Sequence, residues 1–371
     1  MSLPGYSLRG DYLLWTLLGA LALFSAWHPA AIPTYAGLVE WPTIATLSGL
    51  LLLTAGIEAS GFLHQLAARV LRVMPDERRL ALFLLTASML LAAVLTNDIA
   101  LFILVPLTLS LQQHAALPVR RLVIFEALAV NTGSMLTPIG NPQNIFLWQT
   151  SDVHFQEFIL HMWPPVLIAA LCLLGFACFG FRTEPLRLHA LEAPMPVRRP
   201  MLYASLALFL PFLVLADLHH TGIALALVAA ASLLFFRASL RRLDWPLLLV
   251  FVLMFVDLRL LGQLPWVQTA LHALDLKQPL TLYATGALLS QLMSNVPATI
   301  LLSQYSPDWR TLAWGVDVGG FGLVIGSMAS LIALRLGRQP GAFWAFHAWS
   351  LPFFLCTALI TGLWLATSTG G

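Results

Sequence analysis

The sequence predicts an all-α polytopic membrane protein with two inverted-topology repeats, about nine transmembrane helices, two re-entrant hairpins and two broken helices. Three observations predict it: the composition, the spacing of apolar runs, and short segments that recur in the second half. Hydrophobic residues make up 59% of the 371 positions and charged residues 10%, and the mean hydropathy is +0.84. Because a soluble globule of this size needs more polar surface, lipid is the expected solvent.

Nine apolar runs are long enough, with interruptions, to cross about 30 Å of hydrocarbon. They lie near 12–27, 42–63, 122–149, 158–181, 201–216, 222–236, 245–262, 312–334 and 345–367. We interpret the first run as a retained helix and not as a cleaved signal, because no clean small-residue cleavage site follows it. Two further apolar stretches, 80–113 and 279–305, are split near the middle. Length alone does not decide whether each is two full spans or one re-entrant hairpin.

Three segments of the first half match segments of the second half. LTNDIALFIL (95–104) matches MSNVPATILL (293–302), VNTGSMLTPIGNPQN (130–144) matches VDVGGFGLVIGSMAS (316–330), and GLVEWPTIATLSGLLLL (37–53) resembles LRRLDWPLLLVFVLMFVD (240–257). The predicted repeats are 11–181 and 218–371, joined by a connecting loop and helix at 182–217. Paired interruptions in corresponding positions of two repeats indicate a transporter with its ion site where they meet.

The basic residues decide between hairpins and full spans, because cytoplasmic loops collect Lys and Arg. If both split stretches are hairpins that enter from opposite faces, most basic residues fall on the cytoplasmic side, with Lys277 and Arg310 outside and Arg259 buried. The residues on the cytoplasmic side are Arg9, Arg69, Arg72, Arg78, Arg79, Arg120, Arg121, Arg182, Arg187, Arg198, Arg199, Arg237, Arg241, Arg242, Arg335 and Arg338. This path predicts a cytoplasmic N-terminus and a periplasmic C-terminus.

The hairpin tips and helix breaks carry the expected binding groups. A break leaves backbone N–H and C=O groups without helical partners at membrane depth, where only protein or a water-filled cavity can surround them. Half-helix N-termini attract anions, and freed carbonyls with Asn, Ser or Thr oxygens coordinate sodium. We expect the glycines of the breaks to allow close approach and left-handed backbone, although helix packing is the simpler explanation for each glycine alone.

Ionisable residues within apolar sequence are costly in lipid and are therefore functional candidates. Asp98, Asp257 and Asp317 are the expected proton or cation-coupling residues, since a carboxylate among apolar neighbours suits proton uptake and release. For Asp257, an internal ion pair or a position near the outer surface is the alternative, and Arg259 is not its obvious partner because residues two apart do not face each other on a helix. Glu58 and Glu126 are expected in solvated interfacial positions.

The Thr-Asn-Asp and Ser-Asn-Val tips, with the NTGSMLTPIGNPQN break, resemble the ion transporter superfamily over nearly the whole chain. This superfamily holds arsenite permeases, citrate-transporter-like proteins, divalent-anion/sodium symporters and D-type sodium/proton antiporters, and the similarity is closest to its short, YbiR-like bacterial inner-membrane members. The resemblance implies sites formed by Thr96 to Asp98, 131–133, 137–144, 294–295, 317–320 and 326–330. The expected substrate- or ion-binding residues are Thr96, Asn97, Asp98, Asn131, Thr132, Gly133, Thr137, Pro138, Gly140, Asn141, Asn144, Ser294, Asn295, Asp317, Gly319, Gly320, Gly326 and Ser327.

The tips depart from the Ser-Asn-Thr of the dicarboxylate symporters, and no Lys or Arg lies near any motif. We therefore expect a secondary active transporter in the bacterial inner membrane that moves a small anion or a weak acid such as arsenite, linked to H⁺ or Na⁺, by alternating access. A sodium/proton antiporter is the alternative and a channel a weaker one. The sequence has no HExxH pair or Ser/His arrangement for an enzyme. We expect no cofactor, no metal other than sodium and no nucleic-acid partner, and leave a homodimer open.

Overall fold

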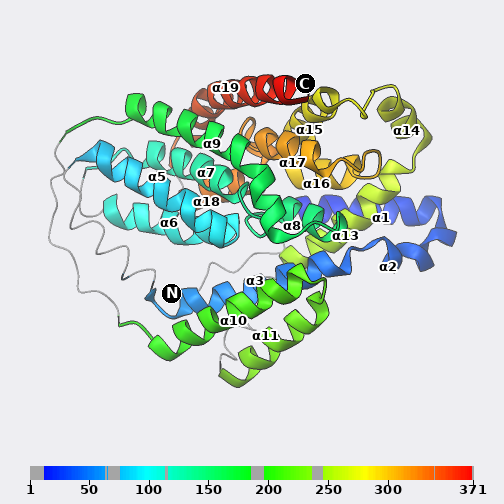
Figure 1. Cartoon of the computed structure of the whole chain (residues 1–371), viewed down its shortest axis with the longest axis horizontal. Coiled ribbons are helices and arrows are strands. Elements are labelled where there is room, and N and C mark those ends of the chain that lie inside the picture. The colour runs from blue at the N-terminus through cyan, green and yellow to red at the C-terminus, as the bar shows by residue number, and fades with distance from the viewer. Residues whose placement is uncertain are drawn as a thin grey trace.

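The computed structural model describes residues 12–62, 65, 76–112, 116–184, 196–235, 245–337 and 339–369. Within these residues the regular elements are helices, with no strand among them (Figure 1). Many of these helices present large hydrophobic side chains on their outer surface, among them Leu23, Phe179 and Trp344. A helical protein with a buried core and an apolar exterior is suited to lipid. The chain is an all-α polytopic membrane protein.

The helices follow the apolar runs closely. Seven runs each form one helix of about the expected length: α1 (Tyr12–Trp27), α3 (Trp41–Ala59), α9 (Phe155–Gly180), α10 (Arg199–Asp217), α11 (Thr221–Phe235), α13 (Trp245–Gly262) and α19 (Ala342–Thr369). The other two runs are broken, as expected. The first consists of α7 (Val119–Ser134) and α8 (Pro142–Thr150), and the second of α17 (Trp309–Gly319), the short 3-10 turn η3 (Val324–Gly326) and α18 (Met328–Gly337). We call residues 135–141 the first break and residues 320–327 the second break.

Three helices, α9, α10 and α19, are by length and hydropathy sufficient to cross a membrane alone. Two bent pairs also pass this test when they are counted together: α1 bends by 119° into η2 (Pro29–Thr34) and α2 (Tyr35–Leu38), and α13 bends by 76° into α14 (Pro265–His272). The sequence reading did not anticipate η2, α2 and α14. Pro29 and Pro265 begin the new helices, because proline lacks the N–H that a continuing helix needs and fits the first turn of a helix.

Each split stretch folds as two helices in contact. The first consists of α5 (Glu77–Val94) and α6 (Asn97–Gln112), and the second of α15 (Pro279–Met293) and α16 (Asn295–Leu302). At the second tip the backbone of Ser294 has a φ of 76°, a left-handed conformation that is uncommon for a residue other than glycine. We call α5–α6 hairpin 1 and α15–α16 hairpin 2.

The helices pair in a pattern that repeats between the two halves. α5 packs on α7 as α15 packs on α17, and α7 packs on α9 as α17 packs on α19. Across the halves, α1 packs on α13 as α11 packs on α3, and α6 packs on α18 as α16 packs on α8. Such reciprocal pairing is what a twofold relation between the predicted repeats would produce. The repeat boundaries themselves stay a prediction.

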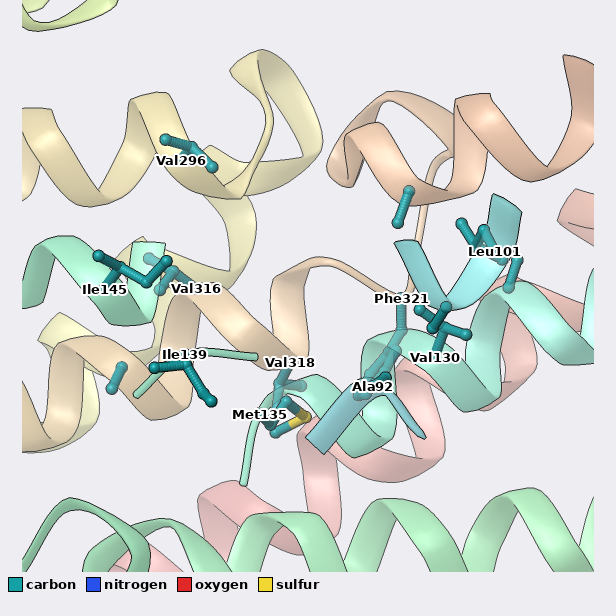
Figure 2. Packing of buried hydrophobic residues seen from close by; sticks show 14 of the residues in the cluster. Ala92, Leu101, Val130, Met135, Ile139, Ile145, Val296, Val316, Val318 and Phe321 are labelled. Carbon is teal, nitrogen blue, oxygen red and sulfur yellow. The ribbon is translucent and has the colours of Figure 1, made fainter. Parts of the chain in front are cut away.

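The helices form two groups in space. The hairpins, the broken helices, α9 and α19 lie together in the upper part of Figure 1, while α3, α10 and α11 lie along the lower side. α3 contacts α8 and α13 contacts α16, so these helices join the two groups. Figure 2 shows that one apolar cluster takes side chains from both halves, among them Met135, Val296, Val318 and Phe321.

Several charged residues lie where the sequence did not place them. Glu126 was expected at a solvated interface, but it is fully buried on α7 and accepts a hydrogen bond from the Thr108 hydroxyl of α6. The expectation failed because α5, α6 and α18 all cover this part of α7. Arg259 pairs with Glu40 and donates to the Leu38 carbonyl, 2.7 Å away. Some basic residues of the topology argument lie outside the described residues: Arg9, Arg69, Arg72, Arg187, Arg237, Arg241, Arg242 and Arg338.

Candidate functional site

Asn131, near the end of α7, reaches across to the second break. Its side-chain oxygen accepts a hydrogen bond from the Ser327 hydroxyl at 3.0 Å, and its amide donates to the Ser330 hydroxyl at 3.2 Å and to the Gly320 carbonyl at 3.4 Å. These partners are about 190 positions away along the chain. A side chain of the first half is therefore bonded to the interrupted backbone of the second half.

Asp317, near the end of α17, makes the reverse connection. One oxygen of its carboxylate accepts hydrogen bonds from the Gln143 amide at 2.8 Å and from the Asn141 amide at 3.1 Å. Asp317 matches Asn131 in the repeat alignment, and Asn141 matches Ser327. The two connections are thus equivalent in position and different in chemistry, because only the second contains an ionisable group.

Hairpin 1 is joined to the first break. The Asn97 backbone N–H donates to the Gly140 carbonyl at 2.8 Å, and the Thr137 hydroxyl donates to the Ala93 carbonyl at 2.7 Å. The Asn144 amide lies 3.3 to 3.4 Å from three carbonyls of this region, those of Ser134, Met135 and Thr137. Carbonyls freed by the break therefore regain partners without a continuous helix, as membrane-depth backbone requires.

Hairpin 2 is joined to the second break by Gln291, a residue that the sequence reading missed. Its amide donates to the Gly319 carbonyl, and its oxygen accepts from the Leu323 backbone N–H at 2.6 Å. Gln291 matches Ala93, and Leu323 matches Thr137. The two hairpins are therefore bonded to their breaks at equivalent positions, by the Thr137 hydroxyl and the Ala93 carbonyl in one half and by the Gln291 side chain and the Leu323 N–H in the other. The sequence feature that could have indicated Gln291 is its position as a polar side chain in an apolar helix, four residues before Asn295.

The two tip asparagines form the same local structure. The side-chain oxygen of Asn97 accepts from the Asp98 N–H at 2.8 Å, and that of Asn295 accepts from the Val296 N–H at 3.0 Å. A Cβ on Gly320 would lie 3.1 Å from the Asn295 amide nitrogen, so this tip lies against the second break. Helices α6 and α16 begin at the hairpin tips, and helices α8 and α18 begin directly after the two breaks. The helix dipoles place partial positive charge at these N-termini, which favours negative charge.

The matched glycines serve close packing. A Cβ on Gly133 would lie 2.0 Å from the Met89 carbonyl oxygen of α5, and a Cβ on Gly319 would lie 2.6 Å from the Ser290 Cβ of α15. The expectation of close approach is confirmed. The expectation of left-handed backbone is wrong for these glycines, because within the described residues only Gly61 and Gly341 have a positive φ among glycines. Helix contact, not backbone freedom, requires glycine here.

Several buried oxygens of the site have no hydrogen-bond partner. They are the second carboxylate oxygen of Asp317, the amide oxygens of Gln143 and Asn144, and the Thr96 hydroxyl. Asp317 is 2% exposed and Gln143 is 1% exposed. An unpartnered buried oxygen is costly. Carboxylate and amide oxygens are also the ligands that hard cations prefer, so the residues present fit a sodium ion or a proton on Asp317.

Other predicted residues lie outside this network. The Thr132 hydroxyl donates to the Leu128 carbonyl of its own helix at 2.8 Å. Pro138 and Gly326 are buried within the breaks. Asp98 is buried in the first turn of α6, where a negative charge is favourable. Asp257 is buried on α13, and neither of its carboxylate oxygens has a hydrogen-bond partner.

Within the part of the chain that the structure describes, Asp317 takes part in no ion pair. The ion pairs there join exposed or half-buried groups, such as Arg310 with Glu157 and Arg259 with Glu40. The charges at the site are thus a carboxylate and the partial charges of helix ends. This arrangement suits binding and release of a small ion, and it is the arrangement of a membrane transporter.

Comparison with known proteins defines the family. A model of the citrate transporter family matches residues 12–319, so the chain belongs to this family, which is a family of transporters and not of enzymes. Inner membrane protein YbiR of Escherichia coli is 44% identical over 365 residues, covering 97% of both chains. The uncharacterized transporter MJ0456 of Methanocaldococcus jannaschii is 32% identical, covering 81% of this chain and 82% of its own.

A solved structure has the same fold. The crystal structure of the Alcanivorax borkumensis YdaH transporter matches with a TM-score of 0.57 and 15% identity. The match covers 96% of this chain and 98% of that chain. At this identity the likeness concerns the fold alone.

Proposed function

We propose that this chain is a secondary active transporter of the bacterial inner membrane that carries a small anion or a weak acid together with H⁺ or Na⁺. The observation that carries the proposal is the reciprocal bonding of Asn131 and Asp317 across the two breaks. The family and the name of the YbiR relative support transport and the inner membrane. The positive charges of the loops support a cytoplasmic N-terminus and a periplasmic C-terminus.

Coupling follows from the electrostatics of the site. An ionised Asp317 opposes entry of an anion, and no basic side chain is bonded to it in the described residues. The repulsion between two close charges is strong in a water-poor interior. A proton or a sodium ion on the carboxylate removes it, and the N-termini of the half-helices then favour the anion. The cation and the anion consequently bind together and leave together.

Alternating access would use the reciprocal bonds. Asn131 and Asp317 are each hydrogen-bonded to the opposite half of the protein. A shift of one half relative to the other would therefore change the hydrogen-bond partners of both residues. The site residues are buried, with Asn131 5% exposed and Asp317 2% exposed. This burial suits a closed state between an outward-open and an inward-open state.

A sodium/proton antiporter is the second candidate, and the buried Asp257 favours it. An unpartnered buried carboxylate binds a proton readily, and a protein with two such groups can exchange cations without an anion. In proteoliposomes with an imposed pH gradient, an antiporter dissipates the gradient on addition of Na⁺ alone. The anion carrier requires the anion as well.

The first experiment is a thermal-unfolding screen of the purified protein against sodium, lithium, arsenite, sulfate, citrate and pH, because a ligand of the folded state raises the apparent stability. We expect an anion or weak acid to raise the unfolding temperature only in the presence of Na⁺ or at low pH. Counterflow of the labelled ligand in proteoliposomes then separates a carrier from a channel, since a channel shows no exchange. A ligand shift that is the same with and without both cations would contradict coupled transport.

A further inference from the structure

A cavity of about 390 Å³ lies away from the transport site. Its walls come from the end of α6, the start of α7, the turn before α19 and the first half of α19. The residues that matter for its chemistry are Gln112, Arg120, Arg121, Ile124, Gln339 and Trp349. Ligand pockets for small molecules have volumes in this range. We call it the arginine cavity.

The arginine cavity is strongly positive. Arg120 and Arg121 both line it, and none of the described residues in its lining is Asp or Glu. Neither arginine forms an ion pair with a carboxylate in the described part of the chain. Two uncompensated guanidinium groups that line the same cavity attract an anion.

Each arginine is held in place by the fold and keeps free donors. Arg120 donates to the Pro340 carbonyl at 3.1 Å, and Arg121 donates to the Gly180 carbonyl and lies 5.9 Å from the ring centroid of Trp349. A guanidinium has five N–H groups in a planar fork, so most donors remain for a ligand. Fixed forks of this kind bind phosphate with two parallel hydrogen bonds.

The other walls suit the remainder of a ligand. Trp349, Ile124 and Leu117 supply an aromatic and aliphatic side, while Gln112 and Gln339 supply neutral amides. Trp349 is fixed by edge contact with Phe125, with ring centroids 5.0 Å apart. The cavity therefore combines charged and apolar walls, which suits a phosphate ester with a carbon skeleton.

The arginine cavity is distinct from the transport site. Arg121 and Asn131 lie on the same helix ten residues apart, which corresponds to about 15 Å at the rise of an α-helix. The intervening residues from Leu122 to Val130 are buried. The distribution of arginines predicts that this end of α7 faces the cytoplasm, where basic pockets between membrane helices bind phosphate head groups.

We propose that the arginine cavity binds a phosphate group through Arg120 and Arg121, either on a free phosphate compound or on the head group of an anionic lipid. The ligand joins the start of α7 in the first predicted repeat to the turn just before α19 in the second. It therefore stabilises one arrangement of these two segments. This site does not depend on the proposed transport function.

The test measures thermal unfolding of the purified full-length protein in neutral detergent at constant ionic strength. The ligands are inorganic phosphate and short-chain phosphatidylglycerol, with short-chain phosphatidylcholine as the zwitterionic control. We expect a saturable rise in unfolding temperature with phosphate, which assigns a free anion, or with phosphatidylglycerol alone, which assigns a lipid. No saturable rise with either anion, or an equal rise with phosphatidylcholine, would overturn the proposal.

Variants locate the site. Arg120→Gln should weaken the apparent affinity about tenfold or more, because it removes charge-assisted hydrogen bonds. Arg182→Gln is the matched control, since Arg182 is an exposed arginine that pairs with Glu184 at 3.2 Å, and it should leave the affinity unchanged. Ala345→Phe fills the arginine cavity from α19 without changing charge and should also weaken binding. Unaltered affinity in both Arg120→Gln and Ala345→Phe would refute the site.

One further variant separates this site from the transport site. Asn295→Ala should keep the response to phosphate or phosphatidylglycerol, because Asn295 lies at the tip of hairpin 2 and does not line the arginine cavity. If Asn295→Ala abolishes the response, the anion binds at the transport site and the arginine cavity is not its site.

Discussion

Asn131 and Asp317 occupy equivalent positions in the two predicted repeats, and each is hydrogen-bonded to the break of the opposite half. The exchange makes the site asymmetric in charge although it is symmetric in position. Hydroxyl groups surround the neutral Asn131 and amide groups surround the acidic Asp317. In the proposed mechanism this difference assigns cation binding to the Asp317 side of the site, and it leads to the first prediction.

Asp317→Asn should abolish the effect of Na⁺ and of pH on ligand binding. The substitution keeps the shape of the side chain and removes the charge, so neither a proton nor a sodium ion is needed to admit an anion. The measurement is the ligand-induced shift in unfolding temperature with and without Na⁺ at several pH values. Glu157→Gln, at the exposed pair with Arg310, is the control. Retained Na⁺ dependence in Asp317→Asn would show that the coupling group lies elsewhere.

The double variant Asn131→Asp with Asp317→Asn moves the carboxylate to the equivalent position. Ser327 and Ser330, which already bond to Asn131, can donate their hydroxyl hydrogens to the new carboxylate. We expect a cation-dependent shift to return in part, compared with Asp317→Asn alone. The same assay checks it, and a double variant that stays independent of cations would argue against the equivalence of the two positions.

Asn97→Ala and Asn295→Ala should each remove the ligand-induced shift and lower stability by about 1 kcal/mol. The stability loss follows because each asparagine oxygen accepts a hydrogen bond from the backbone N–H of the next residue, and loss of a hydrogen bond costs about this amount. Ser303→Ala, at the other end of α16, removes a comparable side-chain hydrogen bond and should keep the shift. An undiminished ligand shift in both tip variants would move the binding site away from the tips.

Gly133→Ala should lower the free energy of unfolding by about 3 kcal/mol or more. Overpacking a well-packed core usually costs about 1 to 3 kcal/mol, and here the clashing atom belongs to the backbone, which cannot easily move. The added Cβ would lie 2.0 Å from the Met89 carbonyl oxygen. Gly319→Ala meets the equivalent contact at Ser290. Gly175→Ala is the control, since nothing lies within 4 Å of its Cβ, and it should leave the unfolding temperature unchanged. Equal behaviour of Gly133→Ala and Gly175→Ala would exclude the close helix contact.

Asp257→Leu should stabilise the protein by about 1 kcal/mol or more, because both oxygens of this buried carboxylate lack partners and an unpaired buried polar group is costly. The transport assay then decides its role. Loss of Na⁺/H⁺ exchange with a raised unfolding temperature would support the antiporter, since functional groups often reduce stability. Unchanged transport would leave Asp257 without a coupling role.

Much of the fold follows from local features of the sequence. The run at 12–27 coincides with α1, and the interruptions at Asn97, Asn295, Pro142 and the 319–326 glycines coincide with helix ends. Local prediction succeeded here because helix length, proline and glycine act within a few residues. The bend before α14 and the short α2 did not follow, since both helices are short and their positions depend on packing.

The sequence by itself determined that this chain is a membrane protein. It also determined at which positions the helices break and which asparagines and aspartates lie at those breaks. Only the tertiary structure decided which of these residues meet. Asn131 is hydrogen-bonded to Ser327, and Glu126 is buried. The Gln291 side chain joins hairpin 2 to its break, where hairpin 1 uses the backbone carbonyl of Ala93. The physical reason is that contacts between different helices depend on how whole helices pack, whether the partners lie 18, 32 or 196 residues apart along the chain, and no local pattern records that packing.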